Sequence, residues 1–321
     1  MRAARASFFF LLAVSMPFRA CEAAYPERPI RLVVPFPPGG GTDLVSRTIQ
    51  PELQARLGQQ VVIDNRGGAQ GLVGTAIAAQ AAPDGYTLVI AEIGAIALAP
   101  AISDKVQFDP VKDFAPITKL IEQPYIMSVH PSVPAKTLAE FIKLAKAKAG
   151  ALNYGSGNTT AHVAQELFYQ TAGVKLTHVP YRGSGPSVTG LVQNEVQVLF
   201  SGPGAALPQL KAGRIRGLAV STLKRSHELP DLPTLDESGF KGFEVSGWYG
   251  LAAPARTPQP VIARLNSELV KILSSGEAAQ NLSRRGYDPA PTTPEAFGKY
   301  LNSEIARWTK AVKQFGIKTL D

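Results

Sequence analysis

Short runs of apolar, mostly β-branched residues alternate along the first part of the chain with a segment whose apolar positions recur every four residues. Residues 30–36, 61–64 and 87–91 are such runs, bounded by proline or glycine, which predicts buried strands. Residues 42–57 carry one apolar stripe, which predicts a helix, and Pro51 within it predicts a kink or a break. The alternation indicates a mostly parallel sheet with covering helices.

A second set of strands and helices follows. Thr137, with Glu140 three residues later, has the sequence pattern of a capping box, which predicts a helix that Gly150 ends. Apolar runs predict further strands, with helices between them, at 125–130, 152–155, 174–180, 196–200 and 217–221. Residues 228–243 are rich in proline, aspartate, glycine and serine, which is typical of a surface connection.

The last part of the chain adds a predicted strand at 243–251 and two long helices, which open at Thr257-Pro258 and Thr293-Pro294. Because these helices have no long set of strands of their own, we expect them to return and pack on the first set. The prediction is an α/β protein of two lobes in which the first domain is discontinuous.

The predicted boundaries place residues 24–123 and 244–321 in lobe 1 and residues 124–243 in lobe 2. The chain would then cross a hinge twice, near residue 124 and near residue 244. In such an arrangement strand carboxyl ends and helix amino ends face a ligand cleft between the lobes.

The first residues have the layout of a secretory signal peptide. Basic residues precede an apolar run at 8–16, and Cys21 and Ala23 stand at −3 and −1 of the expected cut. We therefore expect residues 1–23 to be a cleavable export signal. A lipoprotein, with Cys21 acylated, is the alternative, but residues 18–20 match the usual leucine and two small residues poorly.

Composition narrows the possible chemistry. Cys21 is the only cysteine, so the expected mature chain excludes disulfides, thiolate catalysis and cysteine-ligated metals. The formal net charge is +8, and the densest lysines, within 143–148, indicate a solvated helix face rather than a nucleic-acid site. The most apolar internal stretch, 88–102, contains Glu92 and is too short to span a bilayer. No apolar docking face stands out, so we expect a monomer.

Three glycine-rich segments leave a predicted strand and enter a predicted helix, at 35–43, 154–162 and 178–186. Glycine lets the backbone approach a ligand, and a helix start offers unpaired N–H groups and partial positive charge, which suits a carboxylate. Residues 201–204 end another strand toward the same cleft. The sequence therefore predicts an anion-binding cleft.

Plainer interpretations stand beside this one. Thr42 or Asp43 serves equally as the cap of an ordinary strand-to-helix turn, and His162 fits capping or packing in a first helical turn. Arg182 is suited to a bidentate pair with a carboxylate, or to an exposed loop. Nucleophile-elbow, nucleotide-loop and histidine metal-site patterns do not occur in the sequence, which predicts no enzymatic activity, no metal and no cofactor.

Taken in order, these segments resemble the solute-binding receptors of tripartite tricarboxylate transporters, the Bug family, from about Tyr25 to the C-terminus. The segments that carry the resemblance are YPERPIRLVVPFPPGGGTD, VVIDNRGGAQG, PDGYTLVIA, YGSGNTTAHVAQE, THVPYRGSGPS and GWYGLAAPARTP. The resemblance implies a type II periplasmic binding protein fold that closes on its ligand. It also implies a periplasmic location and delivery of the ligand to membrane transporter subunits. Family ligands are mostly di- and tricarboxylates, with some aromatic acids, amino acids and nicotinic-acid-like compounds.

The resemblance and the glycine-rich segments together define the candidate ligand-binding residues. Those matched to carboxylate-holding family loops, or to other positions expected to line the cleft, are Phe36, Pro38, Gly39, Gly40, Gly41, Thr42, Asp43, Ala91, Glu92, Gly94, Ala95, Ser156, Gly157, Asn158, Thr159, Thr160, Gly183, Ser184, Ser201 and Gly202. His162 and Arg182 are added from the segments themselves.

The chain departs from the family pattern on one wall of the expected cleft. Members often have serine, threonine and histidine where residues 92–95 stand here, and aspartate at the positions of Gly190 and Ser201. The resemblance therefore implies a less hydroxylic wall with an extra carboxylate at Glu92. That disfavours a citrate-like ligand and favours a smaller or partly apolar acid, including one with a cationic group facing Glu92.

The prediction is thus a receptor that captures a small carboxylate and carries out no chemistry on it. Two alternatives use the same cleft: an exported sensor that signals to a membrane partner, and an exported enzyme that acts on a small acid. All three require the glycine-rich turns to converge on one gap between the lobes.

Overall fold

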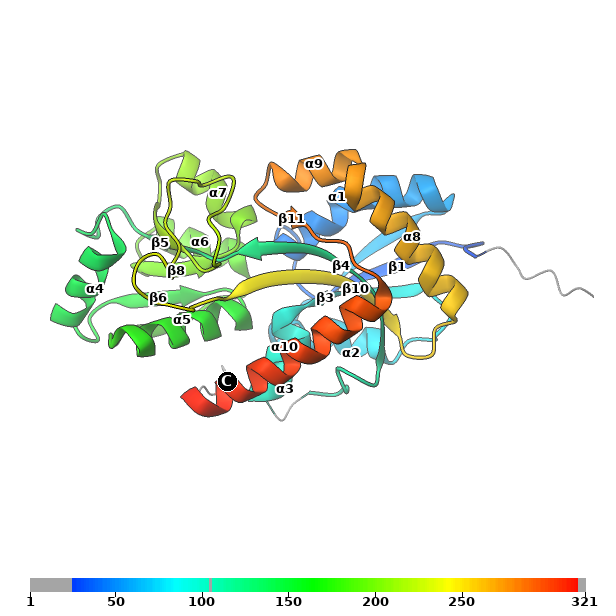
Figure 1. Ribbon diagram of the computed structural model, residues 1–321, viewed down its shortest axis with the longest axis horizontal. Helices are drawn as coiled ribbons and strands as arrows, with labels where there is room; N and C mark the ends of the chain where they lie inside the picture. The colour runs from blue at the N-terminus through cyan, green and yellow to red at the C-terminus, as the bar shows by residue number, and fades with distance from the viewer. Residues whose placement is uncertain (1–24, 104–105, 317–321) are drawn as a thin grey trace, which may run out of the picture.

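The structure, a computed structural model, describes residues 25–103 and 106–316 (Figure 1). The expected signal peptide and Cys21 lie outside the described residues. Strands form two sheets. The larger has the order β11-β4-β10-β3-β1-β2 and consists of β1 (Ile30–Val34), β2 (Val61–Asn65), β3 (Thr87–Glu92), β4 (Phe114–Pro124), β10 (Ser246–Pro254) and β11 (Asp288–Pro289). The smaller has the order β7-β6-β8-β5-β9 and consists of β5 (Ile126–Val129), β6 (Asn153–Ser156), β7 (Thr177–Pro180), β8 (Val198–Ser201) and β9 (Arg216–Val220).

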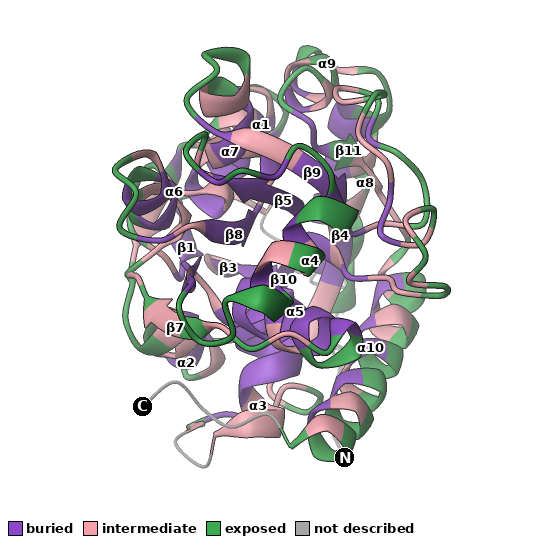
Figure 2. Ribbon diagram, turned by 90° about the vertical axis from the view of Figure 1, so that its left-hand side faces the viewer, coloured by how far each residue is buried: buried purple, intermediate pink, exposed green. Residues whose placement is uncertain are grey.

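Helices cover both sheets. They are α1 (Gly41–Leu57), η1 (Ala69–Gly71), α2 (Leu72–Ala79), η2 (Gly94–Leu98), α3 (Ala99–Ile102), α4 (Leu138–Ala147), α5 (Thr159–Ala172), α6 (Ser184–Val192), α7 (Pro203–Lys211), α8 (Gln259–Ser275), α9 (Glu277–Ser283) and α10 (Pro294–Phe315). Figure 2 shows buried strands enclosed by helices whose outer faces are exposed, most clearly on α4 and α10. The molecule is a two-lobed α/β protein, as predicted.

Most strands in each sheet run parallel. In the larger sheet, β2, β1 and β3 are parallel neighbours, whereas β10 lies antiparallel between β3 and β4. In the smaller sheet, β6 pairs in parallel with β7 and β8, and β5 is antiparallel to β8 and β9. The carboxyl ends of the parallel strands therefore meet at one edge of each sheet.

The chain passes between the sheets along two neighbouring strands. β4 ends at Pro124, and a single residue, Tyr125, separates it from β5, which begins at Ile126. The return strand, β10, begins at Ser246, which is the register partner of Pro124. Figure 1 shows β4 and β10 side by side, reaching from one lobe toward the other. Helices α8 and α10 contact β4, so the C-terminal helices pack on the larger sheet.

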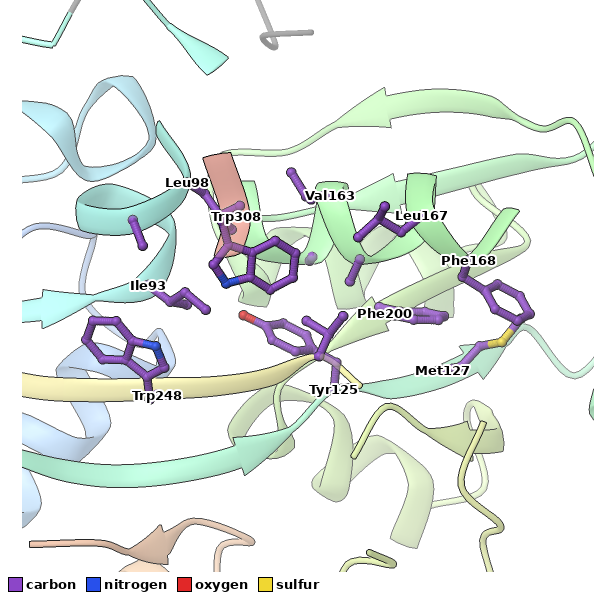
Figure 3. Close-up of a cluster of buried hydrophobic side chains, with 14 of the residues drawn as sticks. Ile93, Leu98, Tyr125, Met127, Val163, Leu167, Phe168, Phe200, Trp248 and Trp308 are labelled. Carbon is purple, nitrogen blue, oxygen red and sulfur yellow. The ribbon is translucent and has the colours of Figure 1, made fainter. Parts of the chain in front are cut away.

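One apolar cluster extends through both lobes. It includes Ile93, which follows β3 of the larger sheet, and Phe168 on α5 and Phe200 on β8 in the smaller lobe (Figure 3). Trp248 on β10 and Trp308 on α10 are 0% and 1% exposed, and both indole N–H groups donate to the carboxylate of Glu304, at 3.3 and 3.1 Å. Their packing fixes the C-terminal helix to the sheet.

The predicted break at Pro51 is wrong. Helix α1 runs unbroken from Gly41 to Leu57 with Pro51 inside it. Proline removes one backbone hydrogen bond, at a cost of about 3 kcal/mol in a helix interior. Pro51 is exposed, whereas the opposite side of the helix, including Val45 and Ile49, is fully buried. Tertiary burial of that apolar stripe outweighs the local preference.

Strand β4 was not predicted from the sequence. Its burial pattern is irregular, with Lys119 and Glu122 interrupting the apolar positions, and its register with β10 shifts at two places. Neither the alternation of a half-buried strand nor the continuous run of a buried one is present.

The predicted capping residue of α4 is confirmed. Thr137 Oγ1 accepts a hydrogen bond from the Glu140 N–H at 3.2 Å, and the Glu140 carboxylate accepts one from the Lys136 N–H at 2.6 Å. The helix ends at Ala147, before Gly150.

We expect Thr137→Ala to lower the free energy of unfolding by about 1 kcal/mol, because an N–H at the helix start loses its acceptor. Urea unfolding measures this effect. Thr137→Ser should retain stability, and Lys146→Ala, on the exposed face of the same helix, is the control. A Thr137→Ala midpoint equal to that of Lys146→Ala would contradict a capping role.

Candidate functional site

A cavity of about 250 Å³ lies where the starts of α1, α5 and α6 meet the end of β3. Its walls come from elements of both sheets. The lining residues are Phe36, Pro37, Pro38, Gly39, Gly40, Gly41, Thr42, Glu92, Gly157, Asn158, Arg182, Gly183, Ser184, Gly185, Pro186 and Tyr249. The three glycine-rich turns that the sequence singled out therefore converge on one space.

The first wall is the turn between β1 and α1, which Asp43 holds in place. The buried Asp43 carboxylate accepts hydrogen bonds from the Gly39 N–H at 3.0 Å, the Arg47 guanidinium at 2.9 Å and the Asn65 amide at 3.1 Å. Burial acts to raise its pKa, but these hydrogen bonds, with Arg47 first, hold the pKa of Asp43 below its ordinary value. Asp43 therefore stays ionised and supports the loop from behind, outside the cavity lining.

The second wall consists of the turns before α5 and α6, which pack backbone to backbone. A Cβ at Gly157 would lie 2.5 Å from the Gly183 carbonyl and 2.6 Å from the Ser184 nitrogen. Gly183 has φ +121°, a conformation that favours glycine. Asn158 caps α5, because its side-chain oxygen accepts a hydrogen bond from the Ala161 N–H at 2.7 Å. Glycine at these positions lets two helix starts share one wall.

Glu92, the last residue of β3, lines the cavity although it is only 2% exposed. Its carboxylate accepts hydrogen bonds from the Ala95 N–H at 3.0 Å, from the Gly94 N–H, and from the Thr160 hydroxyl at 3.3 Å. Burial nevertheless raises the pKa of Glu92 to about 7. The hydrogen bond from Thr160, on α5, joins the two lobes.

Arg182 is the cationic side chain in the lining. It is exposed, and it makes no hydrogen bond or ion pair with any residue that the structure describes. An arginine of this kind keeps its bidentate donor edge available for an anion. Among the candidate residues it is therefore the one best placed to receive a carboxylate.

Sequence reasoning missed four of the lining residues. Pro37, Gly185 and Pro186 lie within the glycine-rich segments, so extending the candidate list to whole segments would have included them. Tyr249 is different, because it reaches the cavity only through the insertion of β10 between β3 and β4. The Tyr249 hydroxyl accepts a hydrogen bond from the Gln123 side chain at 3.0 Å, and burial raises its pKa well above the ordinary value.

A hollow of about 10 Å³ adjoins the cavity and shares Gly41, Asn158, Ser184 and Tyr249 with it. Gly202 lines this hollow rather than the main cavity. The remaining candidates lie outside the lining of both, and they are Asp43, Ala91, Gly94, Ala95, Ser156, Thr159, Thr160, His162 and Ser201.

Several of these residues form a polar cluster behind the α5 turn. Ser156 Oγ lies 2.7 Å from His178 Nε2, and the His162 and His178 rings lie 4.5 Å apart. The Tyr154 hydroxyl contacts His162 Nδ1 at 3.2 Å and donates a hydrogen bond to Glu166. Burial lowers the pKa of each histidine to about 4, so both rings are neutral at pH 7. The cluster supports the wall of the cavity rather than lining it.

These shifts predict how stability changes with pH. Between pH 6.5 and 4 the unfolded chain binds more protons than the folded one at His162 and His178, so the free energy of unfolding falls on acidification. At pH 5 the lowered pKa of His162 alone reduces the free energy of unfolding by on the order of 2 kcal/mol. Glu92 has the opposite effect. Because folding raises its pKa, the free energy of unfolding that depends on Glu92 increases as the pH falls from 7 to 4.5.

Glu92→Gln removes the stabilising effect of acidification that Glu92 provides. We expect this variant to lose more stability than the wild type when urea unfolding is compared at pH 7 and pH 5. An equal loss in the two proteins would contradict the assigned shift at Glu92.

The described part of the chain shows neither a metal-binding cluster nor a membrane-spanning helix. No group of three or more histidine, cysteine, aspartate or glutamate side chains there is arranged to hold a metal ion. No helix in the same residues has both the length and the apolarity needed to cross a membrane.

The chain is similar in sequence and in structure to known solute receptors. The family model described as "Tripartite tricarboxylate transporter family receptor" matches residues 45–317. The protein BugT of Bordetella pertussis is 33% identical over 92% of this chain and 91% of its own length. The structure of R. palustris Rpa4515 with adipate is 36% identical, covers 92% of this chain and 100% of its own, and has a TM-score of 0.89. MatC from Rhodopseudomonas palustris, with bound malate, is 32% identical, covers 90% and 100%, and has a TM-score of 0.85.

Proposed function

Since the chain belongs to the tripartite tricarboxylate transporter receptor family of solute-binding proteins, we propose that it captures a small carboxylate in the periplasm for a membrane transporter. It carries out no chemistry on that ligand. The similar structures Rpa4515 and MatC hold adipate and malate respectively, both of which are small carboxylates, and this supports the proposed ligand class.

One observation carries the proposal: three helix starts face a single cavity, together with Arg182, which pairs with no other residue that the structure describes. Helix starts present unpaired N–H groups and partial positive charge, and these attract an anion without charged side chains. The Arg182 guanidinium adds a full charge and two parallel donors. Together they suit one carboxylate at the junction of the α1, α5 and α6 turns.

Closure of the lobes would complete the site, because its walls come from both sheets. We place the hinge near residues 124 and 244, where the chain passes between the lobes along β4 and β10. A ligand shifts the balance toward the closed form only as far as it binds that form more tightly. The transporter would then recognise the closed form.

We expect Arg182→Ala to weaken carboxylate binding by about 10- to 100-fold, because a hydrogen bond to a charged group contributes about 1.5–3 kcal/mol. A thermal-shift panel of carboxylates would first select the ligand, since binding to the folded state raises its apparent stability. Calorimetry would then measure Kd for the wild type and the variant.

Arg214→Ala is the matched control, because Arg214 is exposed on the surface and lies outside the cavity lining. Equal affinities for the Arg182→Ala and Arg214→Ala proteins would overturn the assignment of the carboxylate site. Recovery of a chemically altered acid after incubation with the wild type would instead favour an enzyme.

A further inference from the structure

The cavity contains one acidic and one basic side chain, and they do not pair with each other. Among the described lining residues, Glu92 and Arg182 alone carry formal charges, and no ion pair joins them. Arg182 extends from the turn before α6 in the smaller lobe, and Glu92 ends β3 in the larger one. The site therefore presents opposite charges from opposite lobes.

Glu92 accepts hydrogen bonds from donors that the protein itself supplies. Two backbone N–H groups and the Thr160 hydroxyl reach its oxygens, and no lysine, arginine or histidine among the described residues contacts it. Donors of this kind favour the ionised carboxylate. Burial opposes it, because a charge removed from water without a counter-ion is costly. A cationic group would therefore stabilise the ionised form of Glu92.

A second ligand carboxylate is poorly matched to this end of the cavity. The donors that would receive it already bind Glu92, and two carboxylates in contact repel each other strongly in a site shielded from water. An ammonium group has the opposite properties, since it donates hydrogen bonds and neutralises the buried charge.

We propose that Glu92 makes the cavity selective for an acid that carries one carboxylate and one ammonium group, in preference to a dicarboxylate. The ligand carboxylate binds Arg182 and the helix starts, and its ammonium group binds Glu92. This inference rests on the proposed function, because it assigns the second end of the same ligand.

Matched pairs of acids test the proposal directly. The pairs are 6-aminohexanoate with adipate, and 4-aminobutyrate with succinate. The two ligands of a pair have the same main-chain length, but one end is an ammonium group in the amino acid and a carboxylate in the diacid. For at least one pair we expect the wild type to bind the amino acid at least about tenfold more tightly in calorimetry. Glu92→Gln should reverse the preference, because it removes the charge but keeps the shape. Glu277→Gln, on the exposed surface of α9, is the control.

The pH dependence gives a second readout that needs no variant. Thr160, Tyr125 and Tyr249 face Glu92, and burial raises the pKa of both tyrosines so that they stay neutral. Glu92 therefore titrates alone among these groups between pH 6 and 8. Affinity for the amino acid should rise about tenfold over that interval as Glu92 ionises, while affinity for the diacid should fall.

The possible failures can be told apart. Tighter diacid binding to the wild type, with an affinity that falls as pH rises, would show that Glu92 binds its ligand in the protonated form and would overturn the inference. Arg182-dependent binding of simple monocarboxylates, with no effect of Glu92→Gln, would overturn it as well but leave the proposed function intact. Failure of every carboxylate to bind would overturn both.

Discussion

Replacing Gly157 with alanine is expected to weaken ligand binding by up to about 100-fold. The added Cβ would lie 2.5 Å from the Gly183 carbonyl carbon and oxygen, a separation that real contacts do not show. The clashing atoms are backbone, so no side-chain rotation relieves them. Forced overpacking costs about 1–3 kcal/mol, and 3 kcal/mol corresponds to roughly 100-fold in Kd.

The clash lies in the wall of the cavity, so it is expected to affect ligand binding. Gly157 and Gly183 both belong to turns of the smaller sheet, between β6 and α5 and between β7 and α6. Opening the lobes cannot separate them. The backbone must move instead, which displaces Arg182 and the start of α6 from the cavity.

Calorimetry with the selected carboxylate would measure this effect, and circular dichroism would show whether the fold is kept. Gly298→Ala is the control, because a Cβ there meets only Pro116 Cγ, at the ordinary distance of 3.7 Å. Unchanged affinity in the Gly157→Ala protein would show that the two turns do not need their close approach.

Trp248→Ala is expected to have the largest effect on stability, lowering the free energy of unfolding by about 3–5 kcal/mol. The side chain is 0% exposed, and its ring packs edge-on against Phe297 with the centroids 5.7 Å apart. Its removal leaves a large cavity between β10 and α10. It also deprives Glu304, 5% exposed, of one of its hydrogen-bond donors.

Urea unfolding followed by circular dichroism measures the loss. Trp308 is the other of the two tryptophans in the chain, so its fluorescence reports on α10 in the variant. Trp248→Phe should cost less, since it refills most of the cavity but still loses the N–H donor. A midpoint for Trp248→Ala within error of the wild type would mean that α10 contributes little to the larger sheet.

Local patterns were sufficient for most elements and for the position of the binding loops. The continuous apolar runs became β1 and β3, and the stripe within 42–57 became α1. Glycine-rich turns after parallel strands necessarily lie at the carboxyl edge of a sheet, which is why the 36–42 loop could be assigned to a site.

The side chains that reach the cavity were harder to predict than the loops. Ser156 and Gly157 are neighbours, yet Ser156 bonds His178 behind the wall while Gly157 lines the cavity. Thr160 sits in the first turn of a helix aimed at the site, but its hydroxyl donates to Glu92. Which side of a turn faces a ligand depends on how the helix packs.

By itself, the sequence determined the α/β alternation, the capped start of α4 and the glycine turns, because these depend on neighbours within a few residues. Only the tertiary structure decided that β10 brings Tyr249 into the cavity. It also decided that, within the described part of the chain, Arg182 has no partner and Glu92 is buried with no cationic side chain against it. Those properties depend on which distant segments come into contact, because the pKa of an ionisable group is set by the atoms packed around it.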